Sequence, residues 1–170
     1  MSWTASNINP TGIAGMIAGI GGTPAFYTGT QTLAADTINV ALYLDTLTTV
    51  TALGETVANA ARNGYNGASG QWVTGNEVAT ANGYTQSGIA VTPKSALVNT
   101  AGVVKFTSTG APQWTATGAG FTANGCLVYD NTVTSKFALC WNWFGGAQTA
   151  SGGGTFTINW NASGIFTVTC

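Results

Sequence analysis

The sequence contains no histidine and very few ionisable side chains of any kind. Its 170 residues include four Lys plus Arg and five Asp plus Glu, so charged residues make up 5% of the chain, against about 25% in an ordinary globular domain. Catalysis of the Ser-His-Asp or Cys-His type is therefore excluded, unless a lysine or a carboxylate pair replaces histidine as the base. Hydroxyls and amides cost less free energy to bury than unpaired ions, which favours a protein that works by packing against other surfaces.

A strong excess of one charge is also missing. The formal net charge is −1 and the isoelectric point is about 4.9, so no basic surface for nucleic acid or for an anionic membrane is expected. The apolar stretch at 12–22 is too short and too glycine-rich to span a bilayer, and no Lys or Arg precedes it to make a signal peptide. We expect no nucleic-acid partner, no membrane partner and no cofactor.

The three cysteines lack the spacing of a metal or redox motif. Cys126, Cys140 and Cys170 form no CxxC pair, and their odd number argues against a disulfide framework. A turn near Val133 would place Cys126 and Cys140 opposite one another on neighbouring strands, where a bridge is possible if the geometry allows it. Without an export signal, we expect both to be reduced and packed as small hydrophobic side chains.

Chain length and hydrophobic content predict one folded domain with a core of its own. Residues 1–35 show no sustained period and are expected to form an N-terminal arm or a short buried helix, and residues 36–170 a β-sandwich domain. Apolar residues at helical spacing predict one short helix at 50–62. The predicted strands are 37–44, 71–73, 84–92, 103–108, 124–130, 136–144, 155–160 and 165–170. The fold class is therefore all-β, a single jelly-roll-like sandwich with one short helix.

Alternation assigns faces near the C-terminus. Phe156, Ile158 and Trp160 take one face of the strand at 155–160, and a turn at 161–164 should join it to the last strand as a hairpin. The continuously apolar stretches at 126–129 and 137–141 predict central strands covered on both sides. The glycine-flanked segment 147–151 is expected to be an exposed loop.

The acidic residues offer little for catalysis. Glycoside hydrolysis needs two carboxylates about 5–10 Å apart, and of the five acids only Glu77 and Asp130 could meet. The alternative is that each acid caps a turn or faces solvent, as Asp130 does if it begins a turn. Phosphate-loop, dinucleotide, HExxH and calcium-loop patterns are absent from the sequence. We expect that the protein is not an enzyme.

Six tryptophans raise the possibility of sugar binding by ring stacking. Trp72, Trp114 and Trp143 lie beside turns rich in Gly, Thr and Asn and could form a glycan platform, whereas Trp141 and Trp160 belong to the core by alternation. The alternative is that all of them serve the core or a subunit interface, as large aromatic residues do in an ion-poor β-protein.

A series of motifs runs through residues 37–170. In order they are Thr37-Ile-Asn-Val-Ala-Leu-Tyr-Leu44, Gly75-Asn-Glu-Val-Ala-Thr-Ala-Asn-Gly-Tyr84, Ile89-Ala-Val91, Trp114-Thr-Ala-Thr-Gly118, Cys126-Leu-Val-Tyr-Asp130, Gly154-Thr-Phe-Thr-Ile-Asn-Trp160 and Gly164-Ile-Phe-Thr-Val168. This series resembles small structural proteins of tailed bacteriophages, described as capsid decoration or cement proteins, head fibres or tail-fibre-like proteins. Two features depart from that family: Thr85-Gln86 follows Tyr84 where an arginine is often found, and the segment before Glu77 is longer.

The resemblance implies a function in the virion. We expect a capsid decoration protein on the head exterior, assembled in the host cytoplasm, with the major capsid protein and its own copies in a homotrimer as partners. Such a protein sums many weak contacts over identical copies. Candidate interface anchors in the N-terminal segment are Trp3, Ile17, Phe26 and Tyr27, unless that segment folds back on its own sandwich. The alternative function is a head-fibre or tail-fibre adhesin module that binds a host surface glycan.

Overall fold

The computed structural model describes residues 7–8, 36–47, 64–66, 72–100, 103–134 and 136–169. These residues form ten strands and no helix: β1 (Asn7–Ile8), β2 (Ile38–Tyr43), β3 (Ile89–Ala90), β4 (Lys94–Thr100), β5 (Val103–Ser108), β6 (Gln113–Thr115), β7 (Phe121–Asp130), β8 (Ala138–Ala150), β9 (Thr155–Thr157) and β10 (Phe166–Thr169). The predicted all-β class is confirmed. The predicted helix at 50–62 lies outside the described residues, and so does the predicted N-terminal segment 1–35 apart from Asn7–Ile8. Within the described part, no helix is long and apolar enough to cross a membrane.

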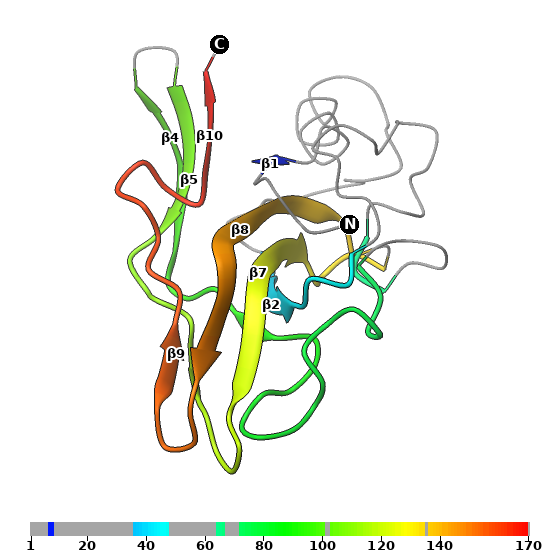
Figure 1. The fold of residues 1–170 in the computed structure, drawn as a ribbon. Helices are drawn as coiled ribbons and strands as arrows, with labels where there is room; N and C mark the ends of the chain where they lie inside the picture. Colours follow the sequence, from blue (N-terminus) through cyan, green and yellow to red (C-terminus); the bar gives the residue numbers. More distant parts are fainter. Residues whose placement is uncertain are drawn as a thin grey trace.

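Three antiparallel sheets make up the sandwich. The largest has the order β1-β8-β7-β2-β3, the second β10-β5-β4, and the third pairs β6 with β9. In Figure 1 the strands β4, β5, β10 and β9 lie along one side of the sheet that contains β8, β7 and β2. The chain therefore builds one broad sheet and covers one of its faces with two smaller sheets.

The face toward the smaller sheets carries the larger of two hydrophobic clusters. It joins Val40 and Val128 of the broad sheet to Phe106 of β5 and to Trp114 and Phe156 of the β6–β9 pair. The aromatic rings meet at close range, with centroids 5.4 Å apart for Phe106 and Phe166 and 5.5 Å apart for Phe121 and Phe156. The first pair lies within the sheet of β5 and β10, whereas the second joins β7 of the broad sheet to β9, so burial of these rings contributes to the packing between the layers.

The opposite face of the broad sheet carries a second cluster. It contains Tyr43 of β2, Leu127 and Tyr129 of β7, and Trp141 of β8, together with Trp72, which lies outside the strands between β2 and β3. All six residues of β2 and the last six of β7 are buried, because alternate side chains enter the two clusters. The predicted central strand at 126–129 is confirmed.

The two cysteines of the broad sheet are free and buried on the same face. Cys126 lies opposite Asn142, and Cys140 lies opposite Val128. They are therefore diagonal neighbours, and the prediction that they face each other directly is wrong by two residues of register. The expected packing as small hydrophobic side chains is confirmed.

Several local predictions are wrong. The strands β9 and β10 do not pair as a terminal hairpin: β9 pairs with β6 and β10 with β5, although Asn161 and Gly164 do bridge a turn between them. The expected loop at 147–151 continues β8 as far as Ala150 because it pairs with β7. In 84–92 only Ile89–Ala90 is a strand, and Trp72–Val73 is not one.

Candidate functional site

Of the aromatic residues that the sequence suggested for binding, the structure describes Trp72, Trp114 and Trp143. The four candidate anchors, Trp3, Ile17, Phe26 and Tyr27, lie outside the described residues. Trp72 is 2% exposed and belongs to the cluster on one face of the broad sheet, with the half-buried Trp143 packed against it. Trp114 is 5% exposed and belongs to the cluster on the other face.

The packing of these rings explains their burial. Trp72 meets Tyr43 edge to face at 5.1 Å and Trp141 at 5.6 Å. Trp114 meets Tyr84 at 5.8 Å. Since both faces of each buried indole are covered by the protein, Trp72 and Trp114 act in the core, and a platform built from all three tryptophans is not present.

A buried carboxylate forms the most elaborate polar cluster in the described chain. Glu77 is 2% exposed. One carboxylate oxygen accepts a hydrogen bond from the Tyr65 hydroxyl at 2.7 Å, and the other accepts from the Tyr84 hydroxyl at 2.6 Å and from the Ser87 amide at 2.8 Å. Burial raises the pKa of Glu77, and the hydrogen bonds from Tyr84 and Tyr65 oppose that rise.

This Glu77 cluster fastens the 72–88 loop to the broad sheet. The Tyr84 hydroxyl also accepts a hydrogen bond from the amide of Leu42 in β2 at 2.8 Å. Ser87 has a φ of 76°, a left-handed conformation that costs a non-glycine residue free energy. Its carbonyl accepts hydrogen bonds from Tyr129 at 2.9 Å and Asn39 at 3.1 Å, so contacts from two strands hold it in place.

Two further acids lie at the other end of β2. Asp36 and Asp130 are both buried, and the Oδ2 atom of Asp36 has no hydrogen-bond partner in the described part of the protein. Burial, and then the charge of Asp130, raise the pKa of Asp36 to about 6, while the charge of Lys94 opposes the rise. Asp130 also accepts a hydrogen bond from the Thr132 amide at 2.8 Å, which confirms that it caps its own turn.

The carboxylates considered for glycoside hydrolysis have separate surroundings. The backbone of Glu77 bridges Tyr43, the last residue of β2, whereas Asp130 pairs with Ile38, the first. Each carboxylate is engaged by its own partners. Among the described residues, no three Cys, Asp or Glu side chains come together as a metal site.

Burial of Asp36, Glu77 and Asp130 leaves few charges on the surface of the described ranges. Of the exposed residues in the described ranges, Asp45 alone is charged. The described lysines are half-buried and have contacts within the fold: Lys105 donates a hydrogen bond to the Ala162 carbonyl, and the ammonium of Lys136 lies 5.2 Å from the centre of the Tyr65 ring.

We call the polar part of this surface the neutral exterior. Its exposed amide and hydroxyl side chains are Thr37, Thr46, Asn66, Thr80, Asn82, Thr85, Thr92, Thr109, Gln113, Thr115, Thr117, Thr132, Thr134, Gln148, Thr149, Ser151, Thr155, Asn159, Asn161 and Ser163. Composition predicted few charges, but the placement of three acids in the interior was not predicted. A surface of this kind can form many weak, uncharged contacts with little desolvation cost.

Comparison of the chain with protein-family models, with curated proteins and with solved structures finds no match in any of the three.

Proposed function

We propose that this protein is a capsid decoration protein of a tailed bacteriophage. It sits on the head exterior as a homotrimer and holds neighbouring capsomers together through non-covalent contacts with the major capsid protein. It acts by adding buried surface across the joints between capsomers, which raises the free energy needed to separate them.

The neutral exterior is the observation that carries this proposal. An exposed ion loses its hydration when it is buried at an interface, and it must find a partner of opposite charge to recover that free energy. The threonine, asparagine and glutamine side chains of the neutral exterior lose much less, because neutral hydrogen bonds replace those made to water. Weak contacts of this kind become strong when identical copies repeat them around a symmetric lattice.

The sequence motifs of the phage resemblance support the fold more than the contact surface. The Val-Ala-Leu-Tyr stretch lies on β2 and the Leu-Val-Tyr-Asp stretch on β7, where these residues are buried. Residues buried in the core cannot contact a capsid directly. The contacts therefore belong to the exposed polar side chains, which differ in kind from the motif residues.

Reconstitution with phage heads tests the proposal. Heads of the phage that carries this gene are stripped of the protein, and the purified full chain is added back. The expected results are rebinding to heads, a copy number in the hundreds per virion, and a higher melting temperature of the heads. Association with tails alone, or only a few copies per virion, would contradict the decoration function.

A further inference from the structure

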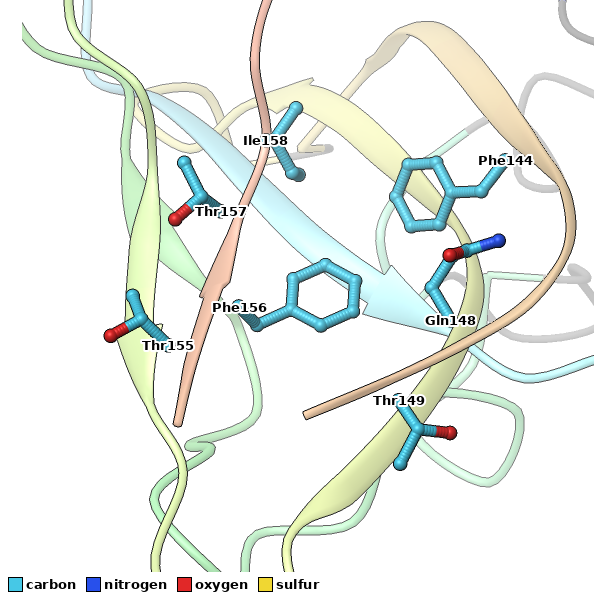
Figure 2. A pocket seen from close by; sticks show the side chains of 7 residues that line it. All are labelled: Phe144, Gln148, Thr149, Thr155, Phe156, Thr157 and Ile158. Atoms are coloured by element: carbon cyan, nitrogen blue, oxygen red, sulfur yellow. The ribbon is translucent and has the colours of Figure 1, made fainter. Parts of the chain in front are cut away.

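A hollow opens between β8 and β9, on the side of the broad sheet that the smaller sheets cover. Its volume is about 430 Å³, in the range of small-molecule sites. Figure 2 shows the rings of Phe144 and Phe156 side by side at the hollow, with the carboxamide of Gln148 beside Phe144. The two ring centroids are 5.9 Å apart, so the rings are in contact and the open space lies beside them.

An irregularity in β8 creates this space. Trp143 pairs with Gly125 and Gln148 with Ala123, so residues 144–147 of β8 lie opposite a single residue of β7. Gly145 and Gly146 have φ angles of 83° and 146°, which a side chain would disfavour, and a Cβ at either would meet nothing within 4 Å. The strand therefore bows outward with open space around it.

The edge of β9 supplies backbone polar groups to the hollow. The Ile158 amide donates to the Pro112 carbonyl at 3.0 Å, and the Gly154 carbonyl accepts from the Ala116 amide at 2.8 Å. Because peptide groups of an antiparallel strand alternate between its two edges, those of Thr155 and Thr157 face away from β6. Both residues line the hollow, and β9 pairs with no strand other than β6 in the described ranges.

We propose that this hollow binds an uncharged carbohydrate of one or two rings. The apolar face of a sugar ring stacks on an aromatic ring, and its hydroxyls need donors and acceptors together. Phe144 offers the ring, and the Gln148 carboxamide and the peptide groups of Thr155 and Thr157 offer both donors and acceptors. None of the residues that line the hollow is ionisable, so a charged ligand finds no counter-charge.

The same lining disfavours an added peptide strand. Strand addition needs a continuous row of backbone groups, but β9 has only three residues and β8 is interrupted at 144–147. The sugar site goes beyond capsid binding, since it takes a small ligand in one hollow, whereas the proposed capsid contacts are spread over the neutral exterior, of which Gln148, Thr149 and Thr155 line the hollow.

The test is an NMR titration of the ¹⁵N-labelled full chain with the methyl glycosides of glucose, galactose and N-acetylglucosamine. At least one should shift the amide signals of 144–149 and 155–158, with a dissociation constant on the order of 1–10 mM, as expected for so small a ligand. Glucuronic acid and glucosamine should bind at least about fivefold more weakly, because their charges would be partly desolvated.

Matched variants identify the site. Gln148→Met should weaken binding at least about fivefold, because it removes a donor and an acceptor at similar size. Gln113→Met changes an exposed glutamine of β6 that does not line the hollow, and it should leave binding unchanged. Phe144→Leu should also weaken binding. Unchanged amide signals from residues away from the hollow would show that this variant keeps the fold.

Three results of the sugar titrations would overturn the sugar site. They are no shift at these amides up to 50 mM of any of the three neutral glycosides, unchanged affinity in Gln148→Met and Phe144→Leu, or equal binding of the charged sugars. A fourth is a shift of the same amides only by an uncharged peptide such as acetyl-Thr-Ala-Thr-Val-Thr-amide, which would assign the hollow to strand addition. Head rebinding by Phe144→Leu, which changes no residue of the neutral exterior, is measured in parallel, and its retention together with weaker sugar binding separates the two functions.

Discussion

The Tyr84 hydroxyl donates a 2.6 Å hydrogen bond to the carboxylate of Glu77, seven residues earlier in the same loop. The same hydroxyl accepts a 2.8 Å hydrogen bond from the Leu42 amide in β2. One side chain thus joins a buried acid to β2. This arrangement allows the fold to hold a carboxylate in its interior and keep it off the outer surface.

Removal of that hydroxyl should destabilise the protein. Tyr84→Phe leaves the Leu42 amide and one carboxylate oxygen of Glu77 without this partner, and we expect a loss of about 2–3 kcal/mol in the free energy of unfolding. Urea unfolding measures it. Tyr129→Phe is the matched control: its hydroxyl donates to the Ser87 carbonyl, which keeps Asn39 as a donor, so the loss should be about 1 kcal/mol. Equal losses in the two variants would contradict this account of the cluster.

The buried tyrosines should make the protein sensitive to alkali. Burial raises the pKa of Tyr65 to about 12, and burial raises the pKa values of Tyr43, Tyr84 and Tyr129 as well. A pKa that is higher in the folded state gives stability that is present below pH 10 and lost as the pH rises through the folded value. We expect these four tyrosines to ionise together with unfolding.

Absorbance at 295 nm and far-ultraviolet circular dichroism, followed from pH 8 to pH 13, test this. Four of the five tyrosines should ionise in one steep step that coincides with loss of the strand signal. Gradual ionisation near pH 10 with the strand signal intact would show that these hydroxyls are accessible in the folded protein.

Asp36 should make the protein less stable at neutral pH than at acidic pH. Its pKa is raised from 3.8 to about 6, first by burial and then by Asp130, against the opposing charge of Lys94. The stability that this carboxyl contributes when protonated is present below pH 4 and lost as the pH rises through about 6. Asp36→Asn stays neutral and keeps a hydrogen-bond donor, so it should stabilise the protein at pH 7.5 by up to about 3 kcal/mol more than at pH 4.

Urea unfolding at the two pH values measures the difference. Asp45→Asn, at an exposed position, is the control and should change stability by less than about 0.5 kcal/mol. An equal effect of Asp36→Asn at both pH values would mean that folding does not raise the pKa of this carboxyl.

Gly88 should not tolerate a side chain. Its φ is 62°, and a Cβ there would lie 1.8 Å from the Val40 carbonyl oxygen of β2. We expect Gly88→Ala to cost about 2–4 kcal/mol, because the loop must move away from β2. Gly75→Ala is the control: a Cβ at Gly75 meets nothing within 4 Å, and thermal unfolding should place this variant close to the wild type. Similar melting temperatures for the two variants would contradict the close approach of the loop to β2.

Local patterns predicted five of the strands in place or nearly so, β2, β5, β7, β9 and β10, but they missed β4 and β6 and did not predict all of the strand partners. The strand at 103–108 and the burial of Phe156 and Ile158 follow from residue type and alternation. The prediction of a terminal hairpin was wrong because a turn at 161–164 shows that the chain changes direction there, and it does not show which strands pair. The Ile158 amide donates a hydrogen bond to the Pro112 carbonyl, and the Ile165 amide donates one to the Phe106 carbonyl. The two strands therefore pair with different distant segments and belong to different sheets.

Sequence patterns did not predict which acids are buried. The partners of Glu77 include Tyr65 and Tyr84, at separations of twelve and seven residues in loops with no regular period. No motif at those spacings predicts a shared hydrogen-bond cluster. The low number of acids was the one available signal, since a chain with five carboxylates and an ion-poor surface can place some of them inside.

The salt dependence of head binding tests the central claim, that this protein adheres through uncharged surface. The full chain is titrated onto stripped heads from 50 to 500 mM NaCl, a range over which the screening length falls from above 10 Å to below 5 Å. We predict saturable binding whose affinity changes by less than about threefold. A loss of tenfold or more with rising salt, or no binding to heads at any salt concentration, would contradict it.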